Sequence, residues 1–128
     1  MKTLITMATG AVLFASLNTM AEEKYQHFAS LDAPNTEVAL CNLQQFNAKL
    51  AALTSKQQLT AEDMVKVHEL TYTLENAVIR LQKDLDNIAV ELEKVHLASE
   101  SLDQKTIQAS GDKYLNATNL IIAPSSCE

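Results

Sequence analysis

The chain has 128 residues and a formal net charge of −6 at pH 7, with ten basic and sixteen acidic residues. Arg80 is the only arginine, and an acidic chain of this kind is poorly suited to nucleic acid or to anionic membrane surfaces. Because Gly and Pro number two each and aromatic residues make up 5%, we expect one all-α domain.

The N-terminal residues have the pattern of an export signal. Lys2 precedes a mostly apolar run from Leu4 to Leu17, and Thr19-Met20-Ala21 places small residues where a signal peptidase cuts. The pattern predicts a signal peptide at residues 1–21 and a periplasmic protein. The apolar run is too short to span a bilayer, so we expect no membrane insertion after cleavage.

The rest of the chain divides into three parts. Residues 22–33 form a polar N-terminal arm with Tyr25, Phe28 and Leu31 at steps of three. We expect this arm either to become ordered by contact with the helices or to form one loose helical turn. Residues 34–122 form the helical domain, and residues 123–128 form a C-terminal tail.

The first helix is predicted from residue 34 to residue 54. Asp32 is placed to cap it, and Pro34 fits the first turn, where a missing N–H costs nothing. Apolar residues then follow at helical spacing: Ala39, Leu43, Phe46, Leu50 and Leu53.

The second helix is predicted to begin at Ala61. Thr60 and Asp63 resemble a capping box, and Leu59 and Met64 fit a hydrophobic staple. The first break in its pattern comes at residues 99–101. A heptad row of mostly apolar residues recurs at alternating steps of three and four along this helix and ends just past the break. We expect the row to pack against the flanking helices. Its residues are Met64, Val67, Thr71, Leu74, Val78, Leu81, Leu85, Ile88, Leu92, Val95, Ser99 and Leu102.

Asp103 is placed to cap a third helix that ends before Pro124. Gly111 would lie inside this helix, at a cost of about 1 kcal/mol relative to Ala unless it lets another backbone approach closely. The alternative is a loop at Ser110-Gly111 followed by a shorter helix.

Two architectures fit these helices. In one, the second helix is a long unbroken central helix, flanked by two antiparallel helices that fold back along its halves. In the other, it breaks near residues 82–87 and the chain becomes an up-down four-helix bundle. The heptad row passes through 82–87 without a breaker, which favours the first.

The first architecture predicts a disulfide. Folding the first helix back over a turn near residue 57 places Cys41 beside residue 74, and folding the third over a turn near residue 101 places Cys127 beside residue 75. In an oxidising compartment, two cysteines brought to one level are expected to form a Cys41–Cys127 bond.

A second apolar row lies outside the heptad row. Val65, Tyr72 and Ile79 recur at seven-residue spacing on the first half of the second helix. Two flanking helices would leave such a row uncovered, so we expect an interaction face there, for a homodimer or for a periplasmic protein partner.

The candidate metal ligands are His68, His96, Glu93, Glu100 and Met64. Glu93 and His96 have the Glu-x-x-His spacing of di-iron bundles, and Met64 lies one turn from His68. His68 and His96 share one side of the second helix but lie roughly 42 Å apart on an unbroken rod. They could meet only if the helix breaks or across an antiparallel dimer.

The stretches Phe46–Leu50, Asp63-Met64, His68–Ala77 and Glu93–Glu100 resemble a family of small exported helical proteins of unknown function from marine gammaproteobacteria. The resemblance implies a periplasmic location and an all-helical fold, and it transfers no activity. In size, compartment and helical layout the chain is also similar to cytochrome b562.

No nucleophile–base pair, phosphate loop or paired carboxylates in an apolar setting can be found, so we expect no enzyme activity and no cofactor. The leading hypothesis is a periplasmic interaction or self-association module. The alternative is a bundle that binds a transition metal or haem.

Overall fold

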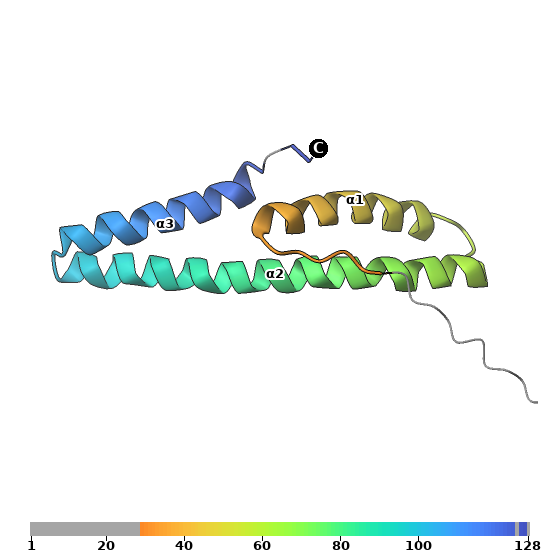
Figure 1. Cartoon of the computed structure of the whole chain (residues 1–128), viewed down its shortest axis with the longest axis horizontal. Coiled ribbons are helices and arrows are strands. Elements are labelled where there is room, and N and C mark those ends of the chain that lie inside the picture. The colour runs from red at the N-terminus through yellow and green to blue at the C-terminus, as the bar shows by residue number, and fades with distance from the viewer. Residues whose placement is uncertain (1–28, 125, 128) are drawn as a thin grey trace, which may run out of the picture.

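The described part of the chain is all-α and organised around one helix. The computed structural model describes residues 29–124 and 126–127, and within them it contains α1 (Thr36–Thr54), α2 (Ala61–Glu100) and α3 (Gln104–Ile122). At 40 residues α2 is unbroken, with a length of roughly 60 Å. Helix α1 lies antiparallel along its first half and α3 along its second half (Figure 1). The predicted three-helix architecture is confirmed, and the four-helix alternative is wrong.

Helix α1 begins two residues later than predicted. Asn35 caps it, with its Oδ1 accepting from the Val38 N–H at 2.9 Å. Asp32, the predicted cap, contributes its backbone carbonyl instead, which accepts from Asn42 Nδ2 at 3.2 Å. Asn is as good a capping residue as Asp, and Asn35 is the one that lies three residues before a first-turn amide without a partner in the helix.

The other two predicted caps are confirmed. Thr60 Oγ1 accepts from the Asp63 N–H while Asp63 Oδ2 accepts from the Thr60 N–H, both at 3.1 Å. Asp103 accepts from the Thr106 N–H at 3.2 Å. Helix α3 passes through Gly111 without a break, so the alternative loop is wrong. A Cβ at Gly111 would meet nothing within 4 Å, so no close approach explains the glycine.

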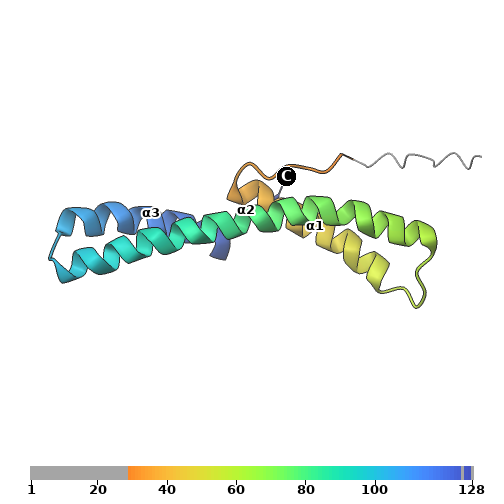
Figure 2. The ribbon, with the colours of Figure 1, turned by 90° about the horizontal axis from the view of Figure 1, so that it is seen from below.

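The two connections differ in length. Six residues, 55–60, join α1 to α2, and three, 101–103, join α2 to α3. The shorter one is a Schellman turn in which the Leu102 and Asp103 amides donate back to the carbonyls of Ser99 and Ala98. Leu102 takes the left-handed position at φ 58°. Helix α3 therefore starts beside α2, whereas α1 diverges from α2 toward the longer connection (Figure 2).

The buried residues of α2 coincide with the predicted heptad row only at Ile88. Apart from Ile88 they are small or polar: Asp63, Thr73, Ala77 and Ala98. In contrast Met64, Val78, Leu85 and Leu92 of the row are exposed. Small side chains let helices approach closely, so the flanking helices settle on the line of small residues. The expectation that the whole row packs in the core is wrong.

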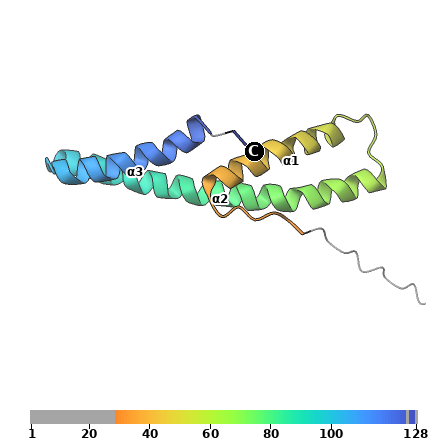
Figure 3. The ribbon, with the colours of Figure 1, turned by 45° about the horizontal axis from the view of Figure 1, so that its top comes forward.

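The predicted disulfide joins α1 to the C-terminal tail that follows α3. The C-terminal end of α3 and the N-terminal end of α1 face each other over the middle of α2 (Figure 3). There Cys41 and Cys127 are bonded, with their Cα atoms 5.4 Å apart and a sequence separation of 86 positions.

The described part of the arm, from Ala29 to Ala33, is extended along α2 (Figure 1). The Leu31 N–H donates to Thr73 Oγ1 at 3.0 Å, and Asn76 Nδ2 donates to the Leu31 carbonyl at 3.1 Å. A helical turn is therefore wrong for these residues. Tyr25, Phe28 and the signal peptide predicted at 1–21 lie outside the described residues. No helix in the described part is long and apolar enough to cross a membrane.

Candidate functional site

One face of α2 is left open. Helices α1 and α3 cover the side that carries Ala77 and Ile88, and the arm crosses the side that carries Thr73 and Asn76. The remaining side carries eight exposed apolar residues, which lie among polar ones such as Glu75 and Gln82: Met64, Val65, Val78, Ile79, Leu85, Val90, Leu92 and Leu97. We call these eight residues the open face of α2.

The predicted interaction row lies partly on the open face. Val65 and Ile79 are exposed, with Ile79 at 65%. Tyr72 is half-buried, and its hydroxyl lies 3.1 Å from His68 Nε2.

Two consecutive hollows mark the middle of the open face. One is bordered by Thr71, Leu74, Glu75 and Val78, with Ile79 at its edge. The next is bordered by Val78, Leu81, Gln82 and Leu85, with Asp86 at its edge. In both, the four residues stand at i, i+3, i+4 and i+7, which is the outline of the hole that receives a side chain of a facing helix in a coiled coil.

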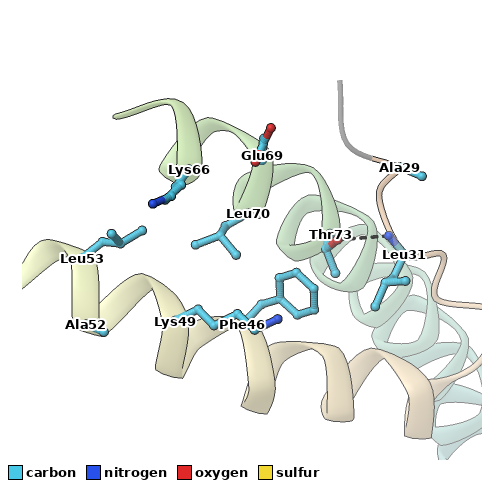
Figure 4. A pocket seen from close by; sticks show the side chains of 10 residues that line it. All are labelled: Ala29, Leu31, Phe46, Lys49, Ala52, Leu53, Lys66, Glu69, Leu70 and Thr73. Carbon is cyan, nitrogen blue, oxygen red and sulfur yellow. Dashed lines mark hydrogen bonds between the residues drawn. The ribbon is translucent and has the colours of Figure 1, made fainter. Parts of the chain in front are cut away.

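A larger pocket lies on a different side of α2, where α1 diverges. It has a volume of about 600 Å³ and lies between the second half of α1 and the first half of α2 (Figure 4). Its walls share no residue with the two hollows. The lining is mainly apolar, with charged residues at its borders: Ala29, Leu31, Phe46, Lys49, Ala52, Leu53, Lys66, Glu69, Leu70 and Thr73. We call this pocket the α1–α2 groove.

The candidate metal ligands do not converge within one chain. His68 and His96 stand on one continuous helix, 28 residues and roughly 42 Å apart. His96 Nε2 lies 3.4 Å from Glu100 Oε1, while Glu93 and Met64 are exposed. Across the described ranges, no group of three or more His, Cys, Asp or Glu side chains is placed to hold a metal.

Ion pairs fix the helix ends and the junction of the three helices. Lys56 donates to Asp63 Oδ1 at 2.7 Å, and this bond, with the Thr60 amide, lowers the pKa of Asp63 to about 2. At the junction, burial opposes ionisation of Asp84, but hydrogen bonds from Arg80 and Thr36 outweigh it and lower the pKa of Asp84.

A third carboxylate bridges α2 and α3. Glu91 Oε1 accepts from Lys94 Nζ at 2.6 Å, and this bond is the main cause that lowers the pKa of Glu91. Glu91 Oε2 lies 3.9 Å from Lys113 Nζ on α3. These three carboxylates are held ionised by donors, an arrangement that anchors helices and does not supply a general acid near neutral pH.

Residues 1–123 match a family whose only description is that its function is unknown. The chain belongs to DUF6746. The match spans all three helices and includes Cys41, but it ends before Cys127. No curated protein and no solved structure matches this DUF6746 chain.

The sequence predicted only part of these surfaces in the DUF6746 fold. The heptad row contains three of the four residues that border each hollow, but burial of that row was expected. The α1–α2 groove has no periodic signal, because its space comes from the divergence of α1 and not from a pattern of side chains.

Proposed function

We propose that the protein is a non-enzymatic helical module that pairs with a second copy of itself through the open face of α2. The observation that carries the proposal is the pair of hollows at seven-residue spacing on a continuous helix. A partner helix that placed apolar side chains in both would complete the heptad pattern that α1 and α3 leave uncovered.

An antiparallel pair suits the charges best. If the two copies of α2 lie antiparallel with Gln82 of one against Gln82 of the other, Val78 of one lies beside Leu85 of the other, and Glu75 lies against Ala89. A parallel pair would instead set Glu75 against Glu75 and Glu93 against Glu93, which is unfavourable. Antiparallel helices also align their macrodipoles favourably.

The periplasm is the compartment we propose for this pairing. The Cys41–Cys127 disulfide supports it, because such bonds persist in oxidising compartments. The pattern at residues 1–21 is typical of a secretory signal, and fractionation of cells that express the untagged protein tests the location.

Sedimentation equilibrium over a range from about 1 to 200 μM tests the pairing. Val78, which borders both hollows, and Leu115, on α3, are each 54% exposed and form a matched pair. We expect the mass of two chains for the wild type and for Leu115→Lys, and the mass of one chain for Val78→Lys. A wild-type monomer throughout, or the same mass for both variants, would contradict the proposal.

The antiparallel register also favours a second candidate function, a transition metal or haem bound between two copies. His68 and His96 each lie 14 residues from Gln82, so this register brings His68 of one copy beside His96 of the other, with Glu93 and Glu100 near by. Metal analysis and a visible absorption spectrum test it. Metal in stoichiometric amount or a Soret band, lost in His68→Ala, would support this function, and a colourless, metal-free dimer would contradict it.

A further inference from the structure

We propose that the α1–α2 groove binds a single-chain anionic amphiphile such as a fatty acid, with the tail between the helices and the acidic headgroup at Lys49 and Lys66. The site is separate from the open face of α2, so it does not depend on the pairing of two copies.

The groove has the size and lining of a small-molecule site. Its volume of about 600 Å³ falls within the range of roughly 300–1,000 Å³ that is usual for such sites. Phe46 and Leu53 from α1 and Leu70 from α2 point into the space between the helices (Figure 4). These apolar groups stay half-buried because α1 leaves α2 here, so a tail that covered them would gain free energy from burial.

One end of the groove is held by the arm. Leu31 and Ala29 line this end, and the Leu31 N–H bond to Thr73 Oγ1 fixes the arm against α2 (Figure 4). The wall on each helix spans eight residues or fewer, or roughly 10 Å. A peptide helix roughly 10 Å long and 10 Å in diameter would occupy roughly 800 Å³, which is more than the volume of the groove. A single extended hydrocarbon tail is thinner than a helix, so it suits the groove better.

The charged residues at the borders favour an anion over a cation. In an acidic chain, two of the three charged residues that line the groove are lysines, Lys49 and Lys66, against Glu69. Lys49 Nζ lies 4.1 Å from the centre of the Phe46 ring, which places an ammonium directly over the apolar lining. Lys66 Nζ is 2.7 Å from Glu62 Oε1, but both side chains are more than half exposed, so this pair is weak and can exchange for a ligand headgroup.

Titration calorimetry of the disulfide-bonded chain tests the proposal with three ligands that share a ten-carbon tail: decanoate, decanol and decyltrimethylammonium, each below its micelle concentration. We expect one saturable decanoate site, roughly three- to tenfold tighter than for decanol, as two exposed ion pairs would give. Decyltrimethylammonium should bind most weakly. Lys49→Gln with Lys66→Gln should remove the preference for decanoate, whereas Lys83→Gln with Lys105→Gln, which removes the same charge elsewhere, should keep it.

A second pair of variants tests the location. Ala52 lines the groove and Ala51 does not, although both are exposed on α1. Ala52→Trp should fill the groove and abolish decanoate binding, and Ala51→Trp should leave it unchanged. Absence of saturable binding, equal affinity for decanol and decanoate, or decanoate binding that is lost in Val78→Lys but kept in Ala52→Trp would overturn the proposal.

Discussion

The two halves of α2 are covered in different ways. In the first half, a six-residue connection lets α1 diverge, the arm adds a third segment, and the α1–α2 groove remains between them. In the second half, a three-residue Schellman turn starts α3 directly beside α2, and Glu91 Oε2 lies 3.9 Å from Lys113 Nζ on α3. The comparison indicates that a longer connection can let two helices diverge and leave a larger groove between them.

The disulfide is the link between the halves, and its removal should have the largest effect. Replacing both cysteines, Cys41→Ser with Cys127→Ser, opens a loop of 86 residues and should lower the free energy of unfolding by roughly 4–5 kcal/mol in the chain-entropy treatment. Urea unfolding measures it. Hydrogen exchange should also quicken at the C-terminal end of α3 before it quickens in the middle of α2. A loss below about 1 kcal/mol would show that the halves hold together without the bond.

Core truncation should separate the halves next. Ile88 is 9% exposed in the half that α3 covers, and Leu70 is half-buried at the groove. Ile88→Ala should cost about 2–4 kcal/mol because it removes a buried side chain and leaves a cavity. Leu70→Ala should cost less, because its side chain is less buried in the folded chain. Thermal and urea unfolding measure both, and equal losses would contradict the difference in burial.

The longer connection should give an acid-sensitive element. The pKa of Asp63 is lowered to about 2 by Lys56 and Thr60, against about 3.9 in an unfolded chain. The stability that Asp63 contributes is therefore present in full above about pH 4 and is lost as the pH falls through about 2. The midpoint of thermal unfolding, followed from pH 6 to pH 2, should fall more steeply in the wild type than in Asp63→Asn. Parallel curves would show that the Lys56–Asp63 pair does not hold in solution.

The shorter connection offers the smallest change, and it should be stabilising. Leu102 is 86% exposed and adopts the left-handed conformation at φ 58°. Leu102→Gly should raise the free energy of unfolding by about 1 kcal/mol, because glycine has no Cβ to strain there. The same substitution at Leu97, exposed but inside α2, should destabilise by a similar amount. Loss of stability in Leu102→Gly would contradict the turn geometry.

Local chemistry made the helix ends and the disulfide predictable. Thr60 and Asp103 are residues that commonly cap helices, and each accepts a hydrogen bond from the backbone amide three residues later. The rise of about 1.5 Å per residue along the helices brings Cys41 and Cys127 to the same level of α2. The start of α1 was missed because Asp32 and Asn35 are equally good caps, and only the folded chain shows which one meets a free amide.

The sequence could not show which apolar residues are covered by the chain itself. The heptad row marks residues suited to contact with a helix, but Ala77 and Ala98 let α1 and α3 come closest on a neighbouring line. Nor does a six-residue connection fix the angle at which α1 leaves α2, so the groove had no counterpart in the sequence. The signal peptide and the metal ligands stay predictions.

Small-angle X-ray scattering on the wild type and on Val78→Lys, at equal concentration, tests the central claim most directly, because it gives both mass and shape. Side-by-side pairing through the open face of α2 predicts the mass of two chains for the wild type, with a thicker cross-section and the same longest dimension as the Val78→Lys monomer. The mass of one chain for the wild type, or a dimer nearly twice as long as the monomer, would contradict the account.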